Sequence, residues 1–159
     1  MNEIRMSYKA VTTLDKFLEG SLDGELKSAI RTRAIIGGIC MAIPLWGIET
    51  IVFVIALWGT YQKISEISTV PFKENFVKNV LGAIILNIVI AFVLGLILDF
   101  LPVLGWVGSF ALGYAQITIS GMAYVKTLKA IHGNRAKTDL NIDRGIQYLK
   151  DNNNNQIQG

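Results

Sequence analysis

The 159-residue sequence has one cysteine, one histidine and few charged residues. A single thiol, Cys40, excludes an internal disulfide, and with the lone His132 it provides no Cys/His ligand set for zinc. The phosphate-binding pattern GxxxxGK[ST] is absent, so we expect no P-loop nucleotide site. Charged residues make up 17% of the chain, against about 25% in a typical globular domain. The net charge is only +3 and no stripe combines basic with aromatic residues, so we expect no nucleic-acid partner.

Basic residues are also missing from two long apolar blocks, which contain none of the 15 Lys and Arg residues. The first block covers 34–61 and the second 80–125, and their only formal charges are Glu49 and Asp99. A charged side chain at the centre of a bilayer costs about 2.5–3.5 kcal/mol on insertion scales. This segregation predicts that both blocks lie in a membrane. A soluble bundle that buries both blocks is the structural alternative.

Proline and glycine divide each block into two helical arms. Pro44 and Gly47 interrupt the first block, and Pro102 and Gly105 interrupt the second with the same Pro-x-x-Gly spacing. The arms of the first block are about 15 and 21 Å long as helices, shorter than a hydrocarbon core of about 30 Å. Those of the second block reach about 33 and 30 Å. We therefore predict an all-α membrane protein with two hairpins, the first short or re-entrant and the second spanning.

The segments outside the blocks are polar or amphipathic. Residues 1–33 are predicted to form amphipathic and basic helices, 62–79 a polar connector, 126–151 a C-terminal segment with a short amphipathic helix, and 152–159 a disordered tail. Six Lys and Arg residues precede the first block, three lie in the connector and six follow the second block. The positive-inside rule then places both termini and the connector in the cytoplasm.

Four motifs within residues 34–128 occur in the order seen in the YcjF-like family of membrane-associated domains, and the chain resembles that family. The motifs are Ile43-Pro44 followed by the acid Glu49, Tyr61-Gln62-x-Ile64, Leu101-Pro102-Val103-Leu104-Gly105 and Ile117-Thr118-Ile119-Ser120-Gly121-Met122-Ala123-Tyr124. Glu49 replaces the family's usual Asp, and Leu104 replaces a turn glycine. Members are often fused to Era-type GTPases or encoded beside them. The resemblance therefore implies a GTPase partner at a bacterial cytoplasmic membrane, and no chemistry of the chain's own.

Four polar residues inside the blocks are candidate functional residues. Glu49 and Asp99 are acids in apolar sequence, which suits an ion or proton site, pairing with a cation on another subunit, or a helix cap. Asn87 and Gln116 lie in the long arms, where they would hydrogen-bond across helices or line a polar pore. No nucleophile or metal ligand accompanies the two acids, so we expect no catalytic, cofactor or metal site.

Small and basic residues complete the set of predicted contacts. The glycines of the blocks, among them Gly37, Gly38, Gly113 and Gly121, predict close packing between helix backbones. The basic residues that flank the blocks are expected at lipid headgroups and set the topology; they are Arg31, Arg33, Lys126 and Lys129.

These features predict a non-enzymatic integral membrane protein, a homo-oligomeric adaptor that tethers a cytoplasmic partner to the membrane. Two alternatives remain open at this point. One is a small oligomeric ion pore lined by the four polar residues of the blocks. The other is a hairpin protein that remodels the membrane by wedging one leaflet.

Overall fold

The computed structural model describes residues 2–22, 24–43, 48–72, 105–136 and 138–157. The expectations made for Pro44, Gly47, Asn87, Asp99 and Pro102 lie outside these residues, as does the predicted arm 80–101.

The described part of the chain is helical, which confirms the predicted all-α class. Its helices are α1 (Asn2–Ser21), α2 (Gly24–Ala42), α3 (Ile48–Ile67), α6 (Trp106–His132) and α7 (Ile142–Ile157), with a 3-10 turn η2 (Gly133–Arg135) after α6. Within these ranges the one β-type pairing is an isolated bridge between Leu22 and Leu140.

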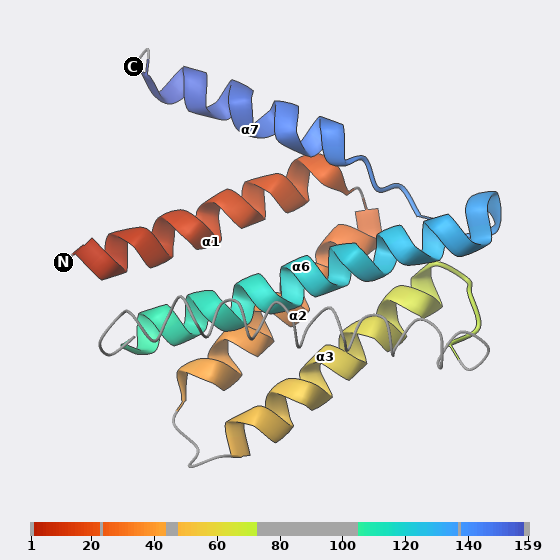
Figure 1. Cartoon of the computed structure of the whole chain (residues 1–159), viewed down its shortest axis with the longest axis horizontal. Helices are drawn as coiled ribbons and strands as arrows, with labels where there is room; N and C mark the ends of the chain where they lie inside the picture. The colour runs from red at the N-terminus through yellow and green to blue at the C-terminus, as the bar shows by residue number, and fades with distance from the viewer. Residues whose placement is uncertain (1, 23, 44–47, 73–104, 137, 158–159) are drawn as a thin grey trace.

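The centre of the structure is formed by α2, α3 and α6 (Figure 1). The first two make an antiparallel hairpin, and α6 packs along α2 in the opposite direction (Figure 1). The α2–α6 contact is close because it is made by glycine: a Cβ added to Gly113 would lie 2.5 Å from the carbonyl oxygen of Gly37. A Cβ on Gly38 would lie 2.9 Å from the carbonyl oxygen of Phe110. The prediction that these glycines bring two backbones together is therefore confirmed.

The hydrophobic core lies between these three helices and the C-terminal half of α1. Near its centre the rings of Tyr61 and Tyr124 are 4.8 Å apart, and the Tyr124 hydroxyl lies 2.7 Å from the Ser65 hydroxyl. Burying these apolar side chains is the main stabilising contribution to the fold. The fully buried members are Leu18, Leu22, Ile30, Ala34, Tyr61, Ile64, Ile117, Tyr124, Val125 and Leu128.

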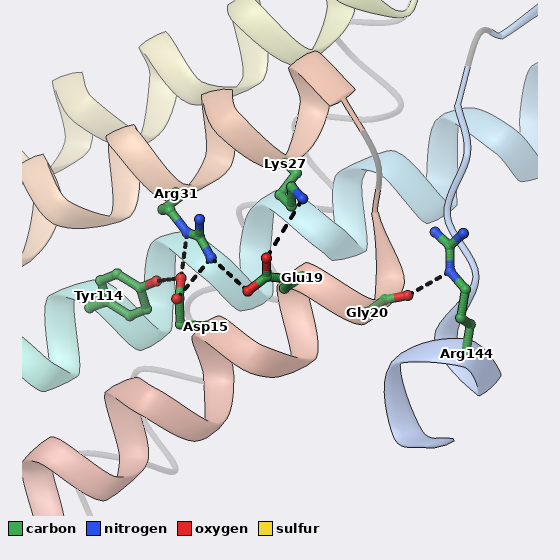
Figure 2. Close-up of polar contacts among 7 residues, drawn as sticks. All are labelled: Asp15, Glu19, Gly20, Lys27, Arg31, Tyr114 and Arg144. Carbon is green, nitrogen blue, oxygen red and sulfur yellow. Dashed lines mark hydrogen bonds and ion pairs between the residues drawn. The ribbon is translucent and has the colours of Figure 1, made fainter. Parts of the chain in front are cut away.

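Helices α1 and α7 form an antiparallel outer layer on one side of this centre, with both chain ends at the same side of the molecule (Figure 1). Two hydrogen bonds join the C-terminal end of α1 to the start of α7. Arg144 Nε donates to the carbonyl oxygen of Gly20 at 2.7 Å (Figure 2). The backbone N–H of Asn141 donates to the carbonyl oxygen of Ser21 at 2.8 Å. The helices touch at Gly145, where an added Cβ would overlap the Ser21 hydroxyl.

Two helices extend past the bounds that the sequence predicts. Helix α3 continues six residues past Tyr61 into the expected connector, because Ile64 continues the buried stripe of α3. Helix α7 runs to Ile157, so the prediction of a disordered tail from 152 is wrong over most of that segment. Asn152 supports this extension, since its side-chain amide donates to the carbonyl oxygen of Tyr148 at 2.8 Å.

The predicted arm 106–125 is the first part of α6, which has 27 residues and is therefore about 40 Å long. Its polar residues Gln116, Thr118 and Ser120 are buried. No helix within the described ranges meets the combined requirement of length and apolar content for crossing a bilayer.

Candidate functional site

The parts of α2, α3 and α6 that carry no Lys or Arg lie together where α2 ends and the other two helices begin, at the left in Figure 1. These parts share a core, but they also leave large apolar side chains exposed. We call these residues the apolar half; they are Ile35, Ile36, Ile39, Ile43, Ile51, Val54, Ile55, Trp58, Trp106 and Val107.

The exposed side chains of the apolar half are regularly spaced. Ile35 and Ile39 are four residues apart on α2, Ile43 follows four residues later just past its end, and Ile51 and Ile55 have the same spacing on α3. Side chains at this spacing lie along one face of a helix, so each helix carries an exposed apolar stripe beside its buried one. Large exposed apolar surface of this kind marks contact with protein or membrane.

The structure does not assemble a polar site from the four candidate residues of the blocks. Gln116 is 8% exposed and lies on the inner side of α6. Glu49 is the second residue of α3, where the helix dipole stabilises a carboxylate, and its side chain lies outside what is described. Asn87 and Asp99 also lie outside the described residues. An ion site or a polar pore built from these residues therefore stays a prediction.

A polar clamp joins α1 to α2 and α6 (Figure 2). The Arg31 guanidinium donates to both carboxylate oxygens of Asp15, at 2.6 and 2.8 Å, and its Nη2 lies 3.4 Å from Glu19. The Tyr114 hydroxyl donates to the same Asp15 carboxylate at 2.8 Å. The hydrogen bond to Asp15 raises the pKa of Arg31 above its ordinary value. We refer to these four residues as the clamp.

The clamp gives Arg31 a role that the sequence does not reveal. Asp15 and Arg31 are 16 residues apart and belong to different helices, so no helical spacing links them. Since the guanidinium is already bonded to two carboxylates, we assign Arg31 to the clamp and not to the headgroup contacts. Lys129 is also engaged, because its ammonium donates to the carbonyl oxygen of Leu140 at 3.2 Å.

A groove of about 440 Å³ lies between α2 and α3, beside the apolar half. Arg33 contributes to its wall and reaches across to α3, where a Cβ on Gly59 would lie 2.7 Å from its Nη1. Lys63 lines the groove from α3 and pairs at 3.1 Å with the exposed Glu66. We call this the α2–α3 groove; its lining residues are Glu25, Ser28, Ala29, Thr32, Arg33, Lys63 and Ile67.

The outer layer presents a second exposed surface. The predicted apolar stripe of α1 is only partly buried: Leu18 is fully buried, whereas Ile4 and Tyr8 are 59% and 72% exposed. On α7, Ile146 and Tyr148 are exposed as well. We call these four exposed side chains the outer face; Ile4 and Tyr8 lie near the N-terminal end of α1, whereas Tyr148 lies beside Gly20 at the C-terminal end of α1.

No family model matches this chain, and neither a curated protein nor a solved structure is similar to it. The resemblance to the YcjF-like family therefore stays a prediction that rests on its four motifs.

Proposed function

We propose that this protein is a non-enzymatic membrane adaptor that places its apolar half in lipid and holds a cytoplasmic partner at the membrane. The observation that carries the proposal is the apolar half itself, ten large exposed side chains on helix segments without a Lys or Arg. Exposing this surface to water is unfavourable by about 25 cal/mol per Å² of apolar area, and lipid removes that cost.

The dimensions of the α2–α3 hairpin favour partial insertion. Its stretches without Lys or Arg, 34–42 and 48–61, are about 14 and 21 Å long and extend only part of the way through a hydrocarbon core of about 30 Å. We infer a re-entrant first hairpin, with the clamp and the basic ends of the helices on the cytoplasmic side. The prediction from sequence that the second hairpin, 80–125, spans the bilayer is not carried into this proposal, because Tyr114 of α6 bonds to Asp15 in the clamp.

The outer face is the surface we propose for the partner. It lies on α1 and α7, which carry the charged segments of the chain and both termini. An Era-type GTPase of bacteria is the partner that the YcjF-like resemblance implies. We further propose a homo-oligomer in which copies meet through exposed stripes of the apolar half, since apolar helices in lipid associate by close packing.

Membrane insertion is tested by flotation of the purified protein with phosphatidylcholine vesicles, together with carbonate extraction of cell membranes. The wild type should float and resist carbonate. The double variant Ile39→Asp/Ile55→Asp should bind more weakly, because an aspartate in the hydrocarbon core costs up to about 3 kcal/mol, or roughly 100-fold in partitioning.

The matched control is Ile131→Asp in the last turn of α6, where an isoleucine of similar exposure lies outside the apolar half. It should bind vesicles as the wild type does. The proposal would be overturned if the wild type could be purified from a lysate as a stable, detergent-free monomer that does not bind vesicles.

Testing the outer face requires point variants, because deleting α1 would also remove Leu18 from the core. We expect Tyr8→Glu/Ile146→Glu to abolish recruitment of the purified Era-type GTPase of the same organism to vesicles that carry the protein. The variant should still insert. Equal recruitment by this variant and by Ile131→Glu would contradict the assignment of the outer face.

A further inference from the structure

The α2–α3 groove lies at the boundary between the parts of the hairpin that carry Lys or Arg and the parts that carry neither. Arg33 is the last basic residue before the first apolar block, and Lys63 is the first one after it. Because α2 and α3 run antiparallel, both cations line the same groove although they are 30 residues apart. With the apolar half in lipid, this level of the molecule coincides with the headgroup layer.

The chemistry of the groove suits a phosphate. Among the described residues no carboxylate pairs with Arg33, whose planar guanidinium can bond two phosphate oxygens at once. Lys63 adds a second cation, and its pair with Glu66 is solvent-exposed and therefore weak. The groove is also lined by two hydroxyl residues, Ser28 and Thr32, one turn apart on the α2 face that holds Arg33.

The single acid of the groove limits what it can bind. Glu25 lies eight residues before Arg33, which is about 12 Å along the helix and away from the apolar half. Two cations and one carboxylate give the lining a formal charge of +1, which matches a singly charged phosphodiester better than a polyphosphate. The volume of about 440 Å³ is within the usual range of small-molecule sites.

We propose that the α2–α3 groove binds the phosphodiester headgroup of an anionic phospholipid through Arg33 and Lys63, with Ser28 and Thr32 as additional donors. This assignment rests on the proposed membrane function and adds a specific lipid site to it. The headgroup would hold the hairpin at a fixed depth, since the cations stay at the phosphate level while the apolar half lies below.

The test compares binding to phosphatidylcholine vesicles with binding to vesicles that contain phosphatidylglycerol. We expect the wild type to bind the anionic vesicles more tightly. Arg33→Gln/Lys63→Gln should lose about fivefold in affinity for each cation, roughly 25-fold together, on anionic vesicles only. The matched control Arg135→Gln/Lys150→Gln removes the same two residue types at exposed positions outside the groove and outside the predicted headgroup contacts, and it should retain most of the preference.

Three outcomes would overturn the lipid site. Equal losses in both double variants would show a general attraction between a basic protein and an anionic surface. Release of the wild type from anionic vesicles by millimolar inorganic phosphate would assign the groove to free phosphate. No difference between the two vesicle types would show that the groove binds no anionic lipid. Failure of the adaptor proposal is distinguishable, because it appears as loss of wild-type binding to phosphatidylcholine as well.

Discussion

Replacing Gly113 with alanine tests the close backbone contact between α2 and α6. The added Cβ would lie 2.5 Å from the carbonyl oxygen of Gly37 and 2.8 Å from Met41 Cγ. The methionine can move aside, but the carbonyl belongs to the backbone of α2, so the helices must separate. Overpacking of a filled interior costs about 1–3 kcal/mol, and a clash with backbone belongs at the upper end of that range.

The helix propensity of alanine acts in the opposite direction. Alanine is more favourable than glycine by about 1 kcal/mol in a helix interior. The net expectation for Gly113→Ala is therefore a loss of about 2 kcal/mol in the free energy of unfolding. For a chain of 150–250 residues each kcal/mol shifts the melting temperature by about 2–4 °C, so we expect a decrease of about 4–8 °C. Circular dichroism during urea and thermal unfolding, in one fixed detergent or buffer, measures both quantities.

Gly121→Ala is the matched control, two turns further along the same helix and facing the same neighbour. Its Cβ would meet only side-chain atoms of Ile30, at 3.2–3.3 Å, and these can shift by a few tenths of an ångström. The propensity gain should then balance the tighter packing and leave stability within about 0.5 kcal/mol of the wild type. If Gly113→Ala were as stable as Gly121→Ala, the close approach of α2 and α6 would be refuted.

Two further predictions concern polar contacts that the same unfolding measurements can check. A double-mutant cycle on Asp15 and Arg31 should give a coupling free energy of about 1 kcal/mol, because the pair is bidentate but only half-buried. The exposed pair Lys63–Glu66 is the control and should give about 0.3 kcal/mol. Equal coupling energies for the two pairs would refute the clamp. Tyr124→Phe should lower the free energy of unfolding by about 1–2 kcal/mol, because it leaves the buried Ser65 hydroxyl without its partner. The control Tyr148→Phe, at an exposed position of α7, should leave this free energy unchanged. An unchanged stability in Tyr124→Phe would contradict the buried hydrogen bond.

The helix ends beside the predicted breaks follow from the sequence. Helix α2 ends at Ala42 and α3 begins at Ile48, on either side of the Pro44–Gly47 interruption. Helix α6 begins at Trp106, directly after Gly105. Proline lacks the N–H that would continue a helix, so these ends depend on local chemistry that a sequence displays. The close approach at Gly37 is predictable for the same reason, since a missing side chain is visible in the sequence.

Contacts between distant segments were not predictable in this way. The clamp joins Asp15 to Arg31 and Tyr114, which are 16 and 99 residues away. In the sequence these charged residues cannot be told apart from charged residues that only face solvent. The order of the Asn-rich end of α7 was also missed, because composition alone favours disorder there and does not report the helix that precedes it. Arg33 was predicted at the headgroups, but its grouping with Lys63 needed the antiparallel pairing of α2 and α3.

The strongest argument for a nonaqueous surface comes from comparing helices within this one molecule. Helix α1 also exposes Ile4 and Tyr8, but it carries the charged residues Arg5, Lys9 and Lys16 as well, so the part of it outside the core is mixed. In α2, by contrast, the segment from Ala34 has a buried face of alanine and glycine and an exposed face of isoleucine. A helix that is apolar all round is buried in its working environment. The described core covers only the alanine and glycine face, so the isoleucine face is available for a second apolar contact. We propose lipid as that contact because Arg33 and Lys63 lie at the margin of this face.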